Sequence, residues 1–232
     1  MQLLLETREV GRVTVVRCSG RILSGEESEA LFTHVGWLLH DRRAIVLQMS
    51  EVAFVDSSGL GTMVRCLTAA RKKGGDIKLC NLPPHVRKVL ELTHLMQMFD
   101  THDSEENAIA CFYRSPVPAE QNSRSGASLL CVDSSVDVLA YLREFLRRAG
   151  YDVDSSASLP DALVLMRAKH YRLVLTGQLK GASGAQDRFQ QACARVTVLP
   201  LGEDFSALDA GEAGSALLEK ISACLKTSAQ SS

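Results

Sequence analysis

The sequence has 232 residues, a length that favours two small domains over one large domain. Hydrophobic residues make up 46% and charged residues 23% of the chain, a composition that excludes wholesale disorder. Lys and Arg number 26 against 27 for Asp and Glu, and aromatic residues make up only 5%. The chain therefore lacks both the basic field and the stacking surfaces of a nucleic-acid binder.

Residues 1–112 predict an α/β domain, a mixed sheet with helices packed against it. Apolar residues at 3–5 and 13–16 flank a turn at Gly11, which predicts an opening β-hairpin. The apolar periodicity predicts further strands at 44–49 and 76–80, and helices at 26–40, 60–73, 84–93 and after Asp103. Lysines at 72–73 and glycines at 74–75 mark the end of the second of these helices.

The segment 113–127 loses this periodicity and collects Pro, Ser, Asn and Gly, so we expect a linker there. Beyond it the sequence predicts a second domain at 128–226 and a frayed polar tail at 227–232. The expected strands are 128–132, 151–153, 173–175 and 196–199, and the expected helices are 136–149 and 158–169, the latter opened by an N-cap at Ser158. This alternation predicts a parallel sheet covered on both faces.

Common signatures of enzymes and metal sites do not occur in the sequence. It contains no Walker A loop, no H-E-x-x-H pair and no G-x-S-x-G elbow, and residues 59–61 lack the third glycine of a dinucleotide-binding loop. The seven cysteines include no C-x-x-C pair, and the six histidines have no ligand spacing with carboxylates. We therefore predict a protein that is not an enzyme, with no catalytic residues, no metal and no cofactor.

The cellular location is predicted from the N-terminus and the cysteines. Three leucines at 3–5 are followed by Glu6 without a basic flank, so we expect no secretory signal. No stretch has the roughly 18 apolar residues needed to span a bilayer, so no membrane partner is expected. Widely spaced cysteines, odd in number, favour buried reduced thiols over a disulfide framework. These features together predict a cytoplasmic protein.

A candidate site lies where a short apolar strand ending at Val55 runs into the helix predicted to follow it. The unpaired N–H groups and the dipole of a helix N-terminus favour negative charge, so this turn could accept an attached phosphate. Asp56 or Ser57 can cap the helix, and Gly59 and Gly61 keep the turn bare of side chains. From these residues alone, a simple N-cap is favoured over a phosphorylation site.

The segment 54–61, followed by residues 72–82 and 86–93, resembles the STAS domain of bacterial anti-sigma factor antagonists over nearly all of 1–112. In that family a partner serine kinase phosphorylates the hydroxyl residue directly after the aspartate, which the resemblance assigns to Ser57. The resemblance also implies that the neighbouring residues belong to the partner interface: Asp56, Ser58, Gly59 and Leu60. The segment 20–24 departs from the family, since Arg21 stands where well-studied members carry acidic residues.

The resemblance implies a regulator of transcription that works by partner switching. The unphosphorylated chain would bind an anti-sigma factor kinase and release a sigma factor, and a PP2C-type phosphatase would be a further partner. Two alternatives stay open. One is a STAS scaffold or small-ligand-binding module without a sigma factor, including a subunit of a lipid transporter. The other is an enzyme hidden in either half, which a convergent cluster of Cys, His and an acid would indicate.

The second domain resembles a response-regulator receiver domain, with a flavodoxin-like parallel sheet, that has lost its chemistry. Asp133 matches one residue of the acidic pair, but Ser134 stands in place of the other, and Gly177 falls where the phosphorylated aspartate should stand. Aspartyl phosphorylation needs an acceptor carboxylate and clustered acids that hold Mg²⁺. We therefore expect a five-element α/β unit that accepts no phosphoryl group.

Overall fold

The structure is a computed structural model that describes residues 2–114, 126–202 and 210–229. The chain divides into two compact units, Met1–Asn122 and Ser123–Ser232. Most of the predicted linker, residues 115–125, lies outside the described residues. Its first two residues, however, belong to the last helix of the first unit, where the ring centre of Tyr113 lies 4.4 Å from the guanidinium of Arg12.

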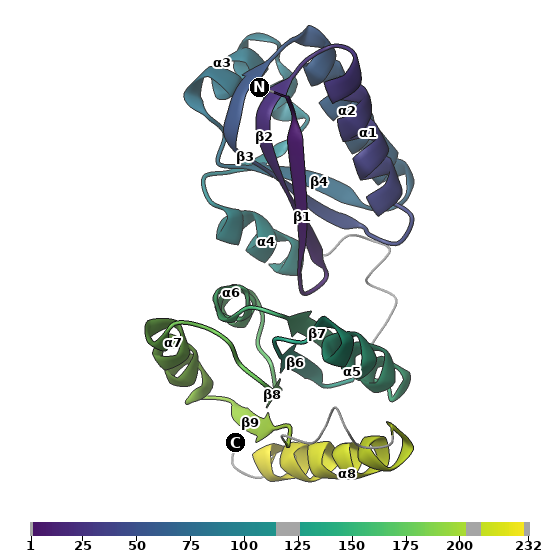
Figure 1. Cartoon of the computed structure of the whole chain (residues 1–232), viewed down its shortest axis with the longest axis vertical. Helices are drawn as coiled ribbons and strands as arrows, with labels where there is room; N and C mark the ends of the chain where they lie inside the picture. The colour runs from purple at the N-terminus through teal and green to yellow at the C-terminus, as the bar shows by residue number, and fades with distance from the viewer. Residues whose placement is uncertain (1, 115–125, 203–209, 230–232) are drawn as a thin grey trace. The chain divides into compact units, whose positions relative to one another are not determined.

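The first unit contains one five-stranded sheet in the order β1-β2-β3-β4-β5 (Figure 1). The strands are β1 (Leu4–Val10), β2 (Val13–Ile22), β3 (Ala44–Val55), β4 (Asp76–Cys80) and β5 (Asp100–His102). β1 and β2 pair antiparallel around Gly11, which has a φ of 62°, and the other neighbouring pairs are parallel. The predicted hairpin and mixed sheet are therefore confirmed.

Helices cover both faces of this sheet: α1 (Glu26–Leu38), α2 (Ser57–Lys72), α3 (Pro84–Leu92) and α4 (Glu105–Arg114). The buried stripes of α1, α2 and α3 share one apolar core with Ile77 and Leu79 of β4. Lys78 lies between these two residues, so strand alternation turns its side chain to the opposite face. There α4 covers the sheet, and the ammonium of Lys78 lies 4.8 Å from the centre of the Phe112 ring.

Two differences from the expected elements of the first unit have simple causes. β3 joins two segments that were expected as separate strands, 44–49 and the short strand ending at Val55, because the exposed residues 50 and 51 interrupt the apolar run without ending the strand. β5 was not predicted, since a three-residue strand is too short to give a periodic pattern.

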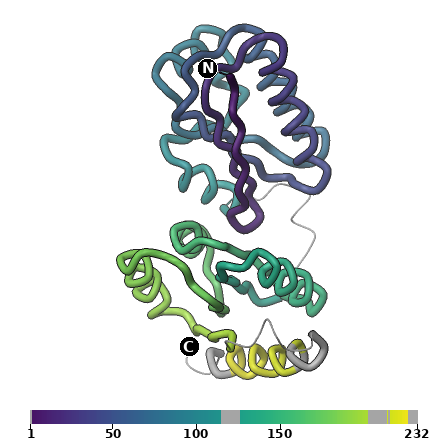
Figure 2. Tube along the Cα trace, viewed as in Figure 1, coloured from purple at the N-terminus to yellow at the C-terminus, as the bar shows by residue number. Residues whose placement is uncertain are grey.

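The second unit, the green-to-yellow part of the trace in Figure 2, contains a four-stranded parallel sheet in the order β7-β6-β8-β9 (Figure 1). Its elements are β6 (Ser128–Val132), α5 (Val136–Arg148), β7 (Asp152–Ser156), α6 (Leu159–Ala168), β8 (Leu173–Thr176), α7 (Ser183–Cys193), β9 (Thr197–Pro200) and α8 (Ala210–Ala229). The strand order matches the first four strands of a flavodoxin-like sheet. The described residues thus give eight elements, and the expectation of a five-element unit is wrong.

Helices pack on both faces of the second sheet, as predicted for a parallel sheet. α5 and α8 share a core with Leu129 and Cys131 of β6, while α6 and α7 contact each other. The predicted cap of α6 is confirmed, because Ser158 Oγ accepts a hydrogen bond from the N–H of Asp161. α8 continues to Ala229, three residues into the predicted polar tail 227–232, and residues 230–232 lie outside the described part.

Cysteines in the described structure are free thiols, and most are buried. Burial raises the pKa to about 12 for each of Cys18, Cys66, Cys80 and Cys131. These four residues therefore behave as small core side chains that stay protonated at neutral pH. Among the described residues, no helix combines the length and apolarity that crossing a membrane requires.

Candidate functional site

The β3–α2 turn is built around Asp56, the N-cap of α2. Its backbone is extended, with φ −91° and ψ −179°, and its Oδ1 accepts a hydrogen bond of 2.7 Å from the N–H of Gly59. The helix then begins at Ser57, and the N–H of Leu60 donates to the carbonyl of Asp56 at 2.9 Å. The N-cap predicted from the sequence is thereby confirmed, with Asp56 as the capping residue.

The second carboxylate oxygen of Asp56 connects this turn to the loop between β2 and α1. Oδ2 accepts a hydrogen bond of 2.9 Å from the N–H of Ser24, an interaction that the sequence did not predict. The N–H of Gly59 and then the N–H of Ser24 hold the pKa of Asp56 below its ordinary value. The carboxylate is therefore charged at neutral pH and fixes two loops with one side chain.

The two glycines of the turn have different roles. A Cβ atom at Gly59 would lie 2.3 Å from the carbonyl oxygen of Ile22 and 3.0 Å from a side-chain atom of Val55. Gly59 is therefore required, because the first turn of α2 approaches the end of β2 too closely for a side chain. Gly61 has nothing within 4 Å of its Cβ position, so its expected role in keeping the turn bare is not a spatial requirement.

The hydroxyl groups of the turn face solvent. Ser57 and Ser58, the first two residues of α2, are both exposed, and Phe54 just before the turn is 51% exposed. Leu60 is only 4% exposed and belongs to the core. Of the predicted interface residues, Ser58 offers an exposed side chain and Asp56 a partly exposed one, while Gly59 and Leu60 are buried supports beneath them.

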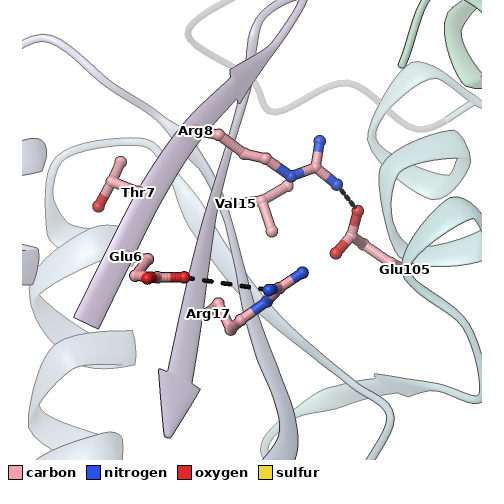
Figure 3. A pocket seen from close by; sticks show the side chains of 6 residues that line it. All are labelled: Glu6, Thr7, Arg8, Val15, Arg17 and Glu105. Carbon is pink, nitrogen blue, oxygen red and sulfur yellow. Dashed lines mark hydrogen bonds and ion pairs between the residues drawn. The ribbon is translucent and has the colours of Figure 1, made fainter. Parts of the chain in front are cut away.

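A small hollow lies elsewhere in the first unit, on the hairpin strands near α4 (Figure 3). Its volume is about 210 Å³, and it is lined by Glu6, Thr7, Arg8, Val15, Arg17 and Glu105. Arg8 pairs with Glu105, and Arg17 lies 3.9 Å from Glu6, so the charges of the lining are balanced. Small-molecule sites usually enclose at least about 300 Å³, so this hollow gives little support to a ligand-binding role.

The second unit has its own carboxylate at a strand-to-helix turn. Asp133 directly follows β6 and is 5% exposed; its Oδ1 accepts from the N–H of Ser135 at 2.6 Å and its Oδ2 from the N–H of Gln178 at 2.9 Å. A Cβ atom at Gly177 would lie 1.7 Å from Asp133 Oδ2. The carboxylate of Asp133 thus fills the space in which a side chain at position 177 would lie.

One cluster of reactive side chains was missed by the sequence analysis. Asp100 and His102 on β5 and Cys111 on α4 place one oxygen, nitrogen and sulfur atom each within 4.8 Å of one another. The carboxylate contacts both partners: Cys111 Sγ donates to Asp100 Oδ2 at 3.6 Å, and His102 Nε2 lies 3.2 Å from Asp100 Oδ1. A nucleophilic cysteine needs a hydrogen bond to its base. Here the thiol and the imidazole each contact the carboxylate of Asp100, so Cys111 and His102 do not form a catalytic pair.

Comparison with known proteins defines the class. The family model of the STAS domain matches residues 5–108, and the chain belongs to the STAS-domain family through this first unit. The chain is 30% identical over 111 residues to the anti-sigma F factor antagonist of Paenibacillus polymyxa, a match that covers 47% of this chain and 94% of the relative. The resemblance expected from the residues around Ser57 is confirmed at this level.

Two further relatives carry the same kind of name. The anti-sigma-B factor antagonist of Bacillus subtilis is 30% identical over 61 residues, which are 26% of this chain and 56% of that protein. The crystal structure of an anti-sigma factor antagonist from Mycobacterium paratuberculosis is 24% identical, with a TM-score of 0.43, and the alignment covers 47% of this chain and 93% of that one.

Proposed function

We propose that the chain is an anti-sigma factor antagonist that works by partner switching, with Ser57 as the phosphorylated residue. The observation that carries the proposal is the position of Ser57. It is the exposed first residue of α2 and directly follows the charged cap Asp56. A kinase can reach this hydroxyl without unfolding the turn.

The charge of a phosphate at Ser57 supplies the switch. A phosphoserine carries about −1.5 to −2 charges, and the N-terminus of α2 tolerates it in the free protein. In a complex the same charge is desolvated beside the carboxylate of Asp56, which is unfavourable. Moving a binding equilibrium from 99:1 to 1:99 takes roughly 5.5 kcal/mol, and the buried dianion can supply much of it.

The partner is an anti-sigma factor with serine kinase activity, and a PP2C-type phosphatase resets the switch. The proposed contact surface consists of the exposed residues around the turn, namely Phe54, Ser57 and Ser58, with the exposed side of α2 and the adjoining 20–27 loop. The hydrogen bond between Asp56 and Ser24 holds that loop beside the turn. The whole surface is therefore preorganised, which favours binding.

Phosphopeptide mapping tests the assignment of the hydroxyl. The full chain is incubated with ATP and the kinase that it captures from its source cells, and the modified peptide is sequenced by mass spectrometry. We expect the phosphate on Ser57 and its loss in Ser57→Ala. The matched variant Ser58→Ala, equally exposed and one residue away, should keep the modification. A phosphate found only on Ser58 or on the serines of 115–125 contradicts the assignment.

Binding measurements test the switch itself. We expect Ser57→Asp to weaken binding of the kinase by about 100-fold, since like charges at an interface cost several kcal/mol and each 1.4 kcal/mol is a factor of ten. Ser57→Ala should bind like the unmodified chain. Equal affinities for both variants, measured by calorimetry, contradict partner switching through this residue.

We further infer that the second unit is receiver-like but accepts no phosphoryl group. The strand order and the position of Asp133 beside Gly177 support this reading. Gly177 has no acceptor oxygen, and both oxygens of Asp133 are already engaged by backbone N–H groups. The unit then serves the protein as a docking element.

A further inference from the structure

The cluster of Asp100, His102 and Cys111 lies on the face of the first sheet that α4 covers, away from the β3–α2 turn. Asp100 and His102 are two residues apart on β5, so their side chains share one face of the strand. Cys111 lies in the last turns of α4. The side chain of Asp100 is 43% exposed, which leaves a path from solvent to the cluster, while that of His102 is only 16% exposed.

His102 Nε2 is the nitrogen of the cluster that faces the carboxylate of Asp100. It is buried and has no hydrogen-bond partner among the described residues, although Asp100 Oδ1 lies 3.2 Å away. An unprotonated ring nitrogen and a carboxylate oxygen that face each other at this distance repel unless a proton or a cation lies between them. A proton on Nε2 of the neutral ring satisfies this contact, and a metal ion bound to both atoms would take the place of that proton.

We propose that Asp100, His102 and Cys111 form a binding site for a divalent zinc-class ion. Zinc takes carboxylate oxygen, imidazole nitrogen and thiolate sulfur as ligands, with bonds of about 2.0 to 2.3 Å. Tetrahedral bonds of these lengths place the ligand atoms roughly 3.3 to 3.6 Å apart. His102 Nε2 lies 3.2 Å from Asp100 Oδ1, and Cys111 Sγ lies 3.6 Å from the other oxygen, Oδ2. One atom from each residue lies within 4.8 Å of the other two, so side-chain rotation is needed to bring all three to the distances of one ion.

Binding changes the protonation of one group. The thiol of Cys111 gives its proton to solvent and its sulfur lone pair to the metal, while neutral His102, with its proton on Nδ1, donates the lone pair of Nε2 and Asp100 donates an oxygen lone pair. A water molecule completes the four-coordinate shell. No electron is transferred, so the site works with the thiol reduced.

Lys78 is the natural competitor of the metal. Its ammonium hydrogen-bonds to Asp100 Oδ2, on the side of the carboxylate away from His102, and lies 3.9 Å from Asp76 Oδ2. Asp76 offers the ammonium a second carboxylate when a metal engages Asp100. The site therefore exchanges a resident monovalent charge for an added divalent ion, and removal of Lys78 should raise the affinity for the metal.

The ion would add bonds between two elements that the hydrogen bond from Cys111 to Asp100 already connects. Two ligands belong to β5, the last strand of the sheet, and the third to α4, the helix that leads to residue 114. The metal would therefore fix the end of the first unit, and metal availability would set how firmly α4 is attached. This role is independent of Ser57 and of the proposed partner switching.

Cobalt, a spectroscopic substitute for zinc, provides the test. The reduced full chain, freed of metal with a chelator, is titrated with Co²⁺, and absorption from thiolate-to-cobalt charge transfer is followed. We expect the band to saturate at one ion per chain and to disappear when Zn²⁺ is added. Cys111→Ser should abolish the band, and His102→Gln should weaken cobalt binding by at least the roughly 10- to 100-fold expected when even an outer-shell partner is lost.

Matched variants separate the site from general effects. Cys224→Ser removes a partly buried thiol of the second unit and should leave the titration unchanged. Lys78→Gln should lower the cobalt concentration at half-saturation. Far-UV circular dichroism establishes that each variant is folded, and His102→Gln and Cys111→Ser test the site independently. No charge-transfer band in the parent chain, or a band that survives Cys111→Ser, overturns the proposal.

Discussion

Asp56 and Asp133 place the same chemical group at equivalent points of the two units, and the outcomes differ. Each follows a strand, precedes a helix and uses both carboxylate oxygens to accept backbone N–H groups from two separate loops. Asp56 lies near the surface with an exposed hydroxyl residue next to it, whereas Asp133 is 5% exposed and fills the space beside Gly177.

The difference shows what decides whether a strand-to-helix turn can carry a chemical signal. In the first unit the carboxylate organises the turn from its edge and leaves Ser57 accessible. In the second unit the carboxylate lies in the space that an acceptor side chain would need. The same pair of hydrogen bonds thus supports a turn with an accessible hydroxyl group in the first unit and a turn whose acceptor space is filled in the second unit.

The largest loss of stability is expected when the turn after β6 loses the carboxylate of Asp133. Asp133→Ala leaves the N–H groups of Ser135 and Gln178 without their charged acceptor, which should destabilise the second unit by about 2 to 3 kcal/mol, since both groups are partly buried. Hydrogen exchange resolved by peptide measures this loss in the second unit. The control Asp137→Ala removes an exposed acid and should change stability by no more than about 1 kcal/mol. Equal effects of both variants contradict the role of Asp133.

A side chain at Gly59 should destabilise the β3–α2 turn nearly as much, because it collides with the backbone of β2. Gly59→Ala introduces a Cβ atom 2.3 Å from the carbonyl oxygen of Ile22, and overpacking of this kind typically costs about 1 to 3 kcal/mol. Gly61→Ala, two residues further along the same helix and in open space, should stabilise the unit by about 0.5 to 1 kcal/mol. Urea titrations of the two variants should therefore show opposite shifts, and shifts of the same sign would show that the approach to β2 is not limiting.

A smaller, pH-dependent effect is expected from the cap. Asp56→Ala should destabilise the first unit by about 1 kcal/mol at neutral pH. Because folding lowers the pKa of Asp56, its contribution is fully present above the unfolded pKa of about 3.9 and is lost as the pH falls through the lower folded value. The difference between parent and variant should accordingly shrink in acid. Asp41→Ala, an exposed acid outside the turn, should show no such convergence.

The last prediction is that the second unit accepts no phosphate, so no change in mass is expected. Incubation of the full chain with acetyl phosphate and Mg²⁺ should add no phosphate, measured by intact mass. Gly177→Asp should not restore acceptance, because the new side chain and Asp133 compete for one volume. A stoichiometric gain of phosphate in the parent chain, abolished in Asp133→Asn, would show that the second unit is a working receiver.

Much of the fold follows from the sequence because its signals are local. The 60–73 helix ends as expected, since Gly74 with a φ of 74° takes the left-handed conformation that stops a helix. α7 was missed because its sequence is mostly polar and buries only Phe189 and Cys193, too few for a periodic pattern. Short or weakly amphipathic elements depend on the packing of their neighbours, which a single sequence does not display.

The sites show the same limit. Asp56 and Ser57 were found because the cap, the glycines and the helix are consecutive in the chain. The hydrogen bond from Ser24 and the position of Cys111 were not predicted, because each residue reaches its partner through the tertiary fold: a loop brings Ser24 to Asp56, and α4 brings Cys111 to β5. Groups that are distant in sequence become neighbours only through the sheet order, for which spacing rules give no signal.

Alkylation of the buried thiols can measure how readily each unit opens. Alkylating reagents attack the thiolate, and Cys66 and Cys131, each with a pKa of about 12, are almost wholly protonated at neutral pH as well as sealed from solvent. Each is modified only after its own unit opens. One of these thiols lies in each unit, so mass spectrometry of the alkylated peptides measures the opening of both units in a single sample, without any mutation.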